Sequence, residues 1–252
     1  MDRQFETALS SHDERSIRVR EKDLAGEVMD ELDFAAALFY LWTGEEPTEA
    51  EHRLVDAILT SLMVHGTTPS SIAARMTATA APEAPQAAIA SGISAVGSRF
   101  AGPMKECSEQ LADLAAADDT DAAVDSFVAA TLESGEYFPG IGHPELDPVD
   151  PRAERLFDIA EEEGLAGEHT AVLRKVREAF EDATGRDLLV NVTGAIAALT
   201  ADVGLSPTAA RGLAVVSRAA GVTGEVLEEQ ERPIGMDIWA AVDSNTTPPR
   251  ED

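Results

Sequence analysis

The chain has 252 residues, 44% of them hydrophobic, which suits a globular protein with a sizeable core and argues against intrinsic disorder. Its 47 acidic and 19 basic residues give a net charge of −28, and such a field repels phosphate backbones and anionic lipid, so neither nucleic-acid nor membrane-surface binding is expected. A single cysteine, Cys107, leaves no disulfide framework and no cysteine-rich metal site.

Almost all of the positive charge is carried by arginine, because the only lysines are Lys22, Lys105 and Lys175. Acid-rich, lysine-poor surfaces are typical of proteins from high-salt cytoplasm, where ions screen the repulsion among the carboxylates. We therefore hypothesise a halophilic protein. The N-terminal sequence MDRQFETALSSHDERS lacks the apolar core of a signal peptide, and no apolar run approaches the roughly 20 residues of a membrane span. A soluble, cytoplasmic protein is expected.

Helical periodicity begins early in the chain. An apolar helix is predicted over Phe34–Trp42, stopped by Gly44 and Pro47. Thr48 and Glu51 then form a capping-box pattern ahead of a run with helical spacing of apolar residues. The following helices are predicted over Ser71–Thr79, Pro85–Val96, Met104–Ala117 and Ala122–Ser134.

A long Gly/Pro-rich loop, Tyr137–Pro151 (YFPGIGHPELDPVDP), interrupts this pattern, and such loops on a rigid helical frame often carry function. Beyond it, Asp150-Pro151 and Ser206-Pro207 each have the form of an N-cap followed by the first helical residue. Only Asp187–Val192 has a strand-like composition, so an all-α fold is predicted. The later helices are predicted over Ala153–Glu163, Thr170–Ala183, Gly194–Val203 and Thr208–Glu229.

Two of the five histidines are candidates for chemistry. His65 follows an apolar helical run (ILTSLMVHG), and His143 lies in the Gly/Pro-rich loop (PGIGHP). Taken singly, each is compatible with a structural, hydrogen-bonded role or with catalysis. Neither has metal-ligand spacing with a partner, so no metal site is predicted.

Three arginines are candidates for anion binding. Arg152 follows the loop as DPR, Arg218 lies in the apolar stretch AVVSRAAG, and Arg232 follows in ERP. Because an unpaired buried guanidinium is very costly, Arg218 must reach solvent or meet an anion. An internal ion pair and a clamp for a substrate carboxylate are both open, since guanidinium groups bind carboxylates through two parallel hydrogen bonds.

Several segments, in order, resemble the citrate synthase family. SIRVREKDLAGEVMDELDFAAALFYLWTGEEPTEAEHRLVDAILTSLMVHG is similar to its early helices, and PSSIAARMTATAAPEAPQAAIASGISAVGSRFAGPM to the segment that leads to its central active-site turn. GIGHP with DPR, LLVNVTGAIAAL and SRAAGVTGEVLEEQERP resemble three later family motifs. The resemblance covers roughly residues 16 to 235, and the SRF turn and short length are most similar to small citryl-CoA lyases and the lyase half of ATP-citrate lyase.

This resemblance implies a role for each candidate. His65 corresponds to a histidine that contacts the dicarboxylate part of the substrate, and His143 to the one that hydrogen-bonds the oxaloacetate carbonyl. Arg152, Arg218 and Arg232 correspond to carboxylate-binding arginines, the last reaching across a dimer interface. The backbone segment that recognises the adenine of coenzyme A corresponds to Phe138, Pro139, Gly140, Ile141 and Gly142.

Two positions depart from the family pattern. The histidine that stabilises the thioester enol falls near Lys105, in GPMKEC, and the aspartate that deprotonates acetyl-CoA falls at Thr193. Threonine is no base at neutral pH, so condensation is disfavoured. Lys105 is either a surface lysine or a cation that stabilises the departing enolate. Thr193 and Asn191 either hydrogen-bond the thioester oxygen or cap the following helix.

The resemblance therefore implies a lyase that splits citryl-CoA, or a related 3-hydroxy-3-carboxyacyl-CoA, into acetyl-CoA and oxaloacetate. The alternatives are a non-catalytic acyl-CoA-binding homologue and a citrate synthase with a substitute base. No permanently bound cofactor is expected, coenzyme A thioester being the substrate, and the implied assembly is a homodimer. The implied architecture is a large helical domain, residues 1–107 plus 205–252, with a small helical domain, residues 108–204, inserted.

Overall fold

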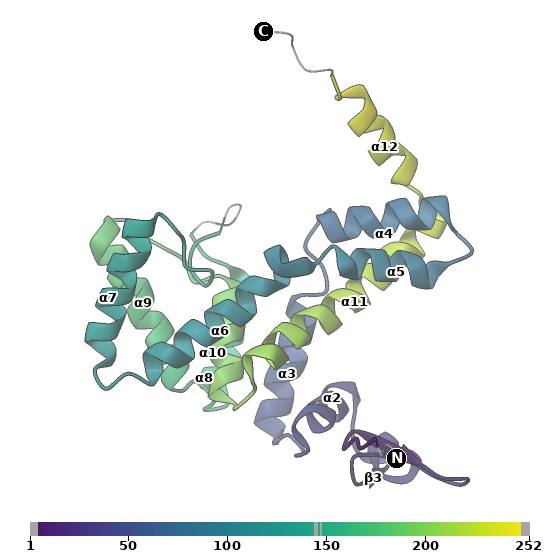
Figure 1. Cartoon of the computed structure of the whole chain (residues 1–252), viewed down its shortest axis with the longest axis horizontal. Coiled ribbons are helices and arrows are strands. Elements are labelled where there is room, and N and C mark those ends of the chain that lie inside the picture. Colours follow the sequence, from purple (N-terminus) through teal and green to yellow (C-terminus); the bar gives the residue numbers. More distant parts are fainter. Residues whose placement is uncertain (1–4, 144–145, 147, 248–252) are drawn as a thin grey trace.

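The computed structural model describes residues 5–143, 146 and 148–247, and it confirms the all-α fold (Figure 1). The helices are α1 (Met29–Glu31), α2 (Phe34–Thr43), α3 (Glu49–Ser61), α4 (Pro69–Ala80), α5 (Pro85–Ser94), α6 (Gly102–Ala115), α7 (Thr120–Ser134), α8 (Pro151–Glu162), α9 (Glu168–Thr184), α10 (Val192–Asp202), α11 (Pro207–Glu231) and α12 (Gly235–Ser244). Two π-helical turns lie over Leu24–Val28 and Gly97–Ala101, and a small antiparallel sheet is formed by β1 (Ser10–His12), β2 (Ile17–Val19) and β3 (Lys22–Asp23).

The predicted helices from α2 to α11 are all present, with ends that differ by a few residues. The strand-like prediction for Asp187–Val192 is wrong: only Val190 pairs, in an isolated bridge with Ile141, and α10 already begins at Val192. The N-terminal sheet was not predicted, because its strands are two or three residues long and too short to show alternation.

Local sequence explains where the central helices begin. The capping box at α3 is formed: the Thr48 hydroxyl accepts from the Glu51 N–H at 3.2 Å, and the Glu51 carboxylate accepts from the Thr48 N–H at 2.7 Å. Ser206 caps α11 and Asp150 caps α8, each before a proline in the first turn. Because α3 ends at Ser61, His65 lies in the loop beyond the helix rather than at its last turn.

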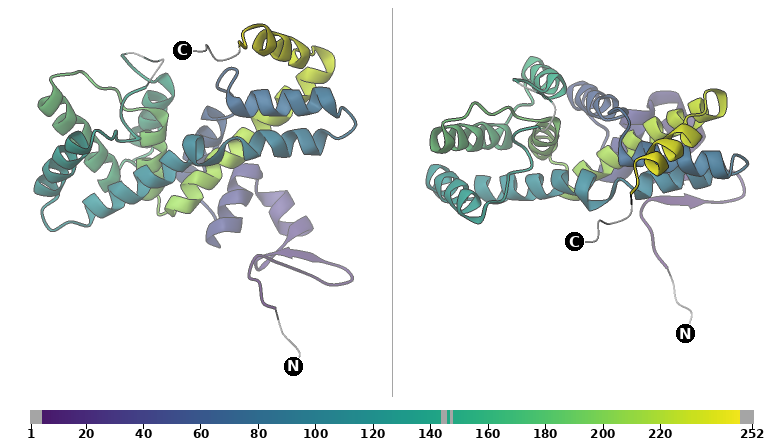
Figure 2. Two further views of the ribbon diagram at one scale, coloured as in Figure 1. Left: turned by 45° about the horizontal axis from the view of Figure 1, so that its top comes forward. Right: turned by 90° about the horizontal axis from the view of Figure 1, so that it is seen from above.

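Helix α11 organises the molecule (Figure 1). It runs obliquely through the structure, with α4 and α5 packed along its C-terminal half and α3, α6 and α10 against the rest. At the far end of α6, helices α7 and α9 form a separate limb, and α10 joins that limb to the centre (Figure 2). Helix α12 packs against α4 and lies apart from the limb.

The buried side chains form three cores. The first joins α2, α3, α8, α10 and α11 and includes Leu54, Ile58, Leu156, Ile196 and Leu213, all at most 2% exposed. The second joins α6, α7, α9 and the α10 residues Ala197 and Ala198, and the third, small and alanine-rich, holds α4 and α5 against α11. Helix α10 contributes to both larger cores, which fixes its N-terminal end between them.

Candidate active site

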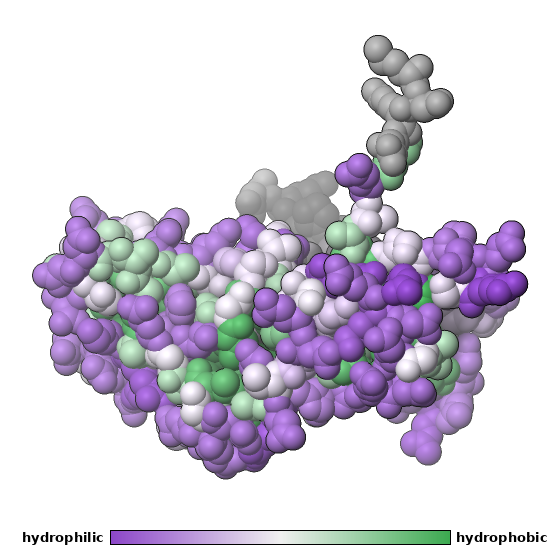
Figure 3. Space-filling model, turned by 90° about the horizontal axis from the view of Figure 1, so that it is seen from below, coloured by the Kyte–Doolittle hydropathy of each residue, from purple (hydrophilic) through white to green (hydrophobic). Residues whose placement is uncertain are grey.

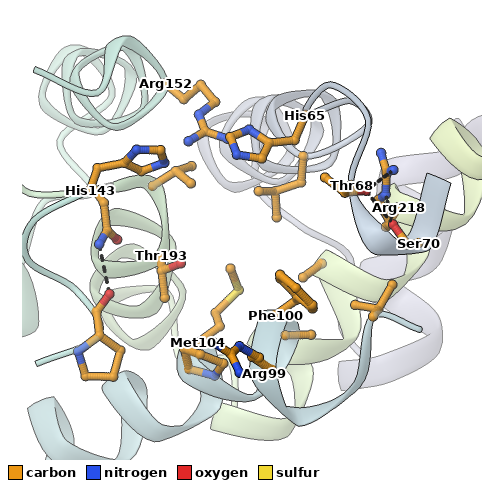
Figure 4. A pocket seen from close by; sticks show the side chains of 18 of the residues that line it. His65, Thr68, Ser70, Arg99, Phe100, Met104, His143, Arg152, Thr193 and Arg218 are labelled. Carbon is orange, nitrogen blue, oxygen red and sulfur yellow. Dashed lines mark hydrogen bonds between the residues drawn. The ribbon is translucent and has the colours of Figure 1, made fainter. Parts of the chain in front are cut away.

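A cavity of about 300 Å³ lies beside the first core, and most of the candidate residues line it (Figure 4). Its walls come from the loop after α3, the start of α4, the π-helical turn before α6 and the start of α6. The Gly/Pro-rich loop, the starts of α8 and α10, and the middle of α11 complete them. The lining residues are Leu62, His65, Thr68, Pro69, Ser70, Val96, Arg99, Phe100, Ala101, Pro103, Met104, Tyr137, Pro139, Gly142, His143, Arg152, Asn191, Val192, Thr193, Ala214 and Arg218.

The charge of this lining is opposite to that of the whole chain. Although the sequence carries 47 acidic residues, no aspartate or glutamate is among the lining residues that the structure describes. Three arginines and two histidines line the cavity instead. Clefts lined by one sign of charge concentrate ligands of the other sign, so the cavity suits an anion.

His65 and His143 face each other across the cavity, as the sequence interpretation required (Figure 4). Their ring centroids are 5.8 Å apart, with the ring planes at 81°. The backbone N–H of Leu146 donates to His143 Nδ1 at 3.0 Å, and Arg152 Nη1 lies 3.3 Å from His65 Nδ1. A guanidinium and a backbone N–H can only donate, so in these two contacts each Nδ1 atom is the acceptor.

Arg152 is held in place by Asp150. Its Nε and Nη2 atoms donate to the two Asp150 oxygens at 2.9 and 2.8 Å, which leaves Nη1 directed at His65. The Asp150 side chain is buried and also accepts from the backbone N–H groups of Arg152 and Val192. One carboxylate thus joins the end of the loop, the start of α8 and the start of α10.

Arg218 is 7% exposed, and each of its three guanidinium nitrogens makes a hydrogen bond. Nε donates to the Ser70 hydroxyl at 2.9 Å, Nη1 to the Met63 carbonyl at 2.9 Å, and Nη2 to the Thr68 hydroxyl at 2.8 Å. Nη2 also lies 3.1 Å from Glu225 Oε1. Arg218 therefore has an internal carboxylate partner and also lines the cavity. The two alternatives for this residue, an internal ion pair and a clamp for a substrate carboxylate, are thus compatible.

The loop before His143 is fixed to the start of α10 by Asn191. Its Nδ2 donates to the carbonyls of Pro139 and Gly142 at 2.9 and 2.8 Å, and its Oδ1 caps α10 by accepting from the Gly194 N–H at 3.1 Å. The cap of α10 is therefore Asn191, and the capping alternative for Thr193 is wrong. Thr193 lies in the first turn of α10 and lines the cavity.

The adenine-binding segment implied by the resemblance is only partly at the cavity. Pro139 and Gly142 line it, and neither Gly140 nor Ile141 does. Phe138 is 3% exposed and packs edge-to-face on Phe127, with ring centroids 5.7 Å apart. The aromatic side chain that does reach the cavity is the preceding residue, Tyr137, which is 72% exposed.

Two candidate residues lie outside the lining. Lys105 forms an i,i+4 ion pair with Glu109 at 2.7 Å and is not among the lining residues, so of its two alternatives the structure favours the surface lysine. The neighbouring Met104 faces the cavity, and one residue further along a helix the side chain is turned by about 100°. Arg232 is exposed at the C-terminal end of α11 and does not line this cavity. Pro144, which follows His143, lies outside the described residues.

Sequence reasoning missed several residues that shape the site. Thr68 caps α4 and, with Ser70, accepts hydrogen bonds from Arg218. Asp150 pairs with Arg152, and Glu225 pairs with Arg218. Two of them had a visible local signal, because Thr68 and Asp150 each precede a proline at the start of a helix. Arg99 and Phe100, from the SRF turn, also line the cavity.

Neither a metal centre nor a membrane span emerges from the described part of the chain. No group of three or more His, Cys, Asp or Glu side chains in residues 5–143, 146 and 148–247 is arranged to hold a metal ion. Over the same residues, every helix is too short or too polar to cross a bilayer.

Comparisons with known proteins agree with this geometry. The family model for the citrate synthase C-terminal domain matches residues 9–236. The citrate synthase of Haloferax volcanii is 30% identical over 219 residues, which are 85% of this chain and 56% of that protein. The chain thus spans little more than half the length of this curated relative.

Solved structures of similar fold include two lyases. The structure of citryl-CoA lyase from Hydrogenobacter thermophilus is 31% identical, with a TM-score of 0.87, and the match covers 99% of this chain and 97% of that one. ATP citrate lyase from Methanosaeta concilii, solved as a D541A mutant with (3S)-citryl-CoA, matches in fold with a TM-score of 0.81 and 20% identity, over 100% of this chain and 43% of that one.

Proposed function

This chain belongs to the citrate synthase family, and on that premise we propose that it is a lyase that cleaves citryl-CoA, or a closely related 3-hydroxy-3-carboxyacyl-CoA, into acetyl-CoA and oxaloacetate. The observation that carries the proposal is the cavity where His65, His143, Arg152 and Arg218 meet without a lining carboxylate among the described residues. The near full-length similarity to a citryl-CoA lyase supports the direction of the reaction.

The substrate carries two free carboxylates, and two of the cavity arginines suit them. Arg152 offers Nη1 beside His65, and Arg218 lies at the opposite wall with Thr68 and Ser70. Because both guanidinium groups are already oriented by protein carboxylates and hydroxyls, little ordering cost remains when substrate binds.

Cleavage requires that the citryl hydroxyl lose its proton, that the forming carbonyl be polarised, and that the departing thioester enolate be stabilised and then take up a proton at its α-carbon. We assign the first two tasks to His143 and His65, which face each other across the cavity. The Thr193 hydroxyl and the N-terminal end of α10, where the helix dipole is positive, suit the third task.

The synthase direction is disfavoured by the same lining. Deprotonating the methyl group of acetyl-CoA needs a base near the α-carbon, and Thr193 occupies the position at which the resemblance implies that base. No carboxylate of the described residues lines the cavity in its place. This absence also favours a second candidate, a homologue that binds the thioester without cleaving it.

One experiment separates these functions. Purified protein in high-salt buffer is given citryl-CoA, and oxaloacetate release is followed by a coupled reduction to malate. We expect turnover, and we expect His143→Ala to lower it by about 100-fold or more, the usual scale for loss of an acid–base group. His52→Ala is the matched control, since His52 contacts Asp33 on the surface away from the cavity.

The outcomes have distinct meanings. Folded protein that binds coenzyme A but releases no oxaloacetate would make the binding homologue correct. Release of free thiol from acetyl-CoA and oxaloacetate would instead support a citrate synthase with a substitute base.

We also propose the domain arrangement and assembly that the resemblance implies. The segment 108–204 would close on the rest of the chain over the bound substrate and exclude water. Arg232, exposed at the end of α11, would serve the site of a second copy in a homodimer. No permanently bound cofactor is required by this chemistry. A solution mass equal to one chain at the concentrations of full activity would contradict the role of Arg232.

A further inference from the structure

Arg99 is the third arginine that lines the cavity. The two free carboxylates of the proposed substrate are already assigned to Arg152 and Arg218, so Arg99 has no role in the proposed function so far. It lies in the π-helical turn Gly97–Ala101, which connects α5 to α6 and begins at a glycine with φ of +45°. In Figure 4 its guanidinium lies beside Met104 and Phe100, on the wall opposite Arg152 and His65. Single π-helical turns are frequent at functional sites.

Arg99 differs from the other two arginines in having no protein partner. Arg152 is bound by Asp150 and Arg218 by Glu225. Within the part of the chain that the structure describes, Arg99 makes neither an ion pair nor a hydrogen bond. At the cavity, this leaves a full positive charge that an external anion can meet.

The position of Arg99 along the cavity indicates which anion. Arg218 is 7% exposed and the side chain of Arg152 is 21% exposed, whereas Arg99 is an exposed residue. Two aromatic side chains that line the cavity are also largely exposed, Phe100 at 51% and Tyr137 at 72%. The cavity thus has an open end at Arg99 and the adjacent Phe100, and Tyr137 is a further exposed lining residue, from the Gly/Pro-rich loop.

We propose that Arg99 binds the phosphate groups of the coenzyme A portion at this open end and determines the preference for coenzyme A over phosphate-free thioesters. The inference rests on the proposed function. Phosphates are strong acceptors of paired guanidinium hydrogen bonds, and exposed aromatic rings suit a purine that must bind one face and leave the other to solvent.

The apolar wall beside Arg99 supports the same orientation. Val96 and Met104 are 7% and 3% exposed, and with Pro103 they line the cavity and lie close to Arg99 in the sequence. This strip suits the uncharged pantetheine arm that joins the thioester to the phosphates. A carboxylate of the citryl group would have to lie away from the two histidines to reach Arg99.

Equilibrium binding of three ligands tests the proposal: coenzyme A, dephospho-coenzyme A and pantetheine, all at one fixed KCl concentration. We expect Arg99→Gln to lower the affinity for coenzyme A by about 5- to 20-fold, because a charge-assisted hydrogen bond is lost whose strength solvent screening has already reduced. The affinity for pantetheine should stay unchanged. Arg99→Lys should recover part of the loss. The matched control is Arg186→Gln, an exposed arginine in the loop after α9 that lies outside the cavity.

The three ligands make each outcome decisive. If Arg99→Gln lowers the affinity for coenzyme A alone, Arg99 binds the ribose phosphate. If it also lowers the affinity for dephospho-coenzyme A, Arg99 binds the diphosphate. Either result supports the proposal. Equal affinity of wild type and Arg99→Gln for coenzyme A, or an equal loss for pantetheine, overturns it. Wild-type protein that binds none of the ligands would instead contradict the proposed function.

Discussion

At the scale of single residues, Asp150 has the most demanding position in the site. Burial alone would raise the pKa of its carboxyl, but hydrogen bonds from Arg152 and from the Val192 N–H, with the charge of Arg152, outweigh burial and lower the pKa below its ordinary value. A carboxyl with a lowered pKa stabilises the folded state above its unfolded-state pKa of about 4, and this stabilisation is lost as the pH falls through the folded-state pKa.

Asp150→Asn should therefore destabilise the protein in a pH-dependent way. We expect about 2–3 kcal/mol less unfolding free energy at pH 7, because the partly buried Arg152 guanidinium loses its counter-charge and the donors around the buried residue 150 side chain keep only part of their hydrogen bonds. Denaturant unfolding of both proteins from pH 7 down to pH 3 measures this. The difference should shrink as the wild-type carboxyl becomes protonated, and a difference that stays constant over this range would contradict the account.

The sequence indicated which residues could line a common cavity, but it did not indicate in which direction the side chain of a helical residue points. His65, His143, Arg152 and Arg218 meet in one cavity, as the resemblance implied. Lys105 does not, because the two neighbours on α6 point about 100° apart and Met104 takes the inward direction. No sequence pattern indicates which of two adjacent residues at a helix start faces a cavity until the helix is packed.

At the scale of elements, the loop before His143 depends on two glycines that touch. A Cβ at Gly194 would lie 2.5 Å from the Gly140 carbonyl oxygen and 2.8 Å from its Cα, so no side chain fits there. This contact lets Asn191 reach both loop carbonyls. The cavity position of His143 therefore depends on the close packing of the loop on α10.

Gly194→Ala should displace the loop and damage the site. Because backbone atoms form the contact and cannot rotate away, we expect a loss of about 2–3 kcal/mol in unfolding free energy and a clear fall in coenzyme A affinity. Gly224→Ala is the matched control, since Gly224 lies in α11 with open space where an alanine methyl group would lie, and alanine there should stabilise the helix slightly. Equal unfolding and binding curves for the two variants would show that the contact is not required.

Elements with local caps were predictable, and one that lacks a local cap was not. The first helical residue of α3, α8 and α11 follows a Thr, Asp or Ser that caps it. Helix α12 begins after Ile234, and its N–H groups are bound by Glu229 from α11, in a network that also includes Arg75 and Thr79 of α4. A cap supplied by a preceding helix gives no start signal at the position where the helix begins.

At the scale of the whole molecule, charge is separated between surface and cavity. Hydrophilic residues cover most of the face seen in Figure 3, with smaller apolar areas between them. Many of the basic side chains are paired with surface carboxylates, as in Arg53 with Glu162 and Glu163, and in Lys175 with Asp121. The excess of acidic residues remains, and its mutual repulsion acts against the compact state.

This excess leads to the halophilic hypothesis in testable form. Raising KCl from 0.1 M to 2 M shortens the screening length from about 10 Å to 3 Å or less, so repulsion among surface carboxylates should fall and the melting temperature should rise by about 10 °C or more. Sucrose at equal osmolality is the control, because it strengthens burial by exclusion from the surface without screening charge. If KCl and sucrose raise the melting temperature equally, or if KCl raises it not at all, the net charge of −28 does not limit stability and the hypothesis is wrong. Coenzyme A binding should respond in the opposite sense, because the salt that relieves surface repulsion also screens the attraction between the ligand phosphates and Arg99.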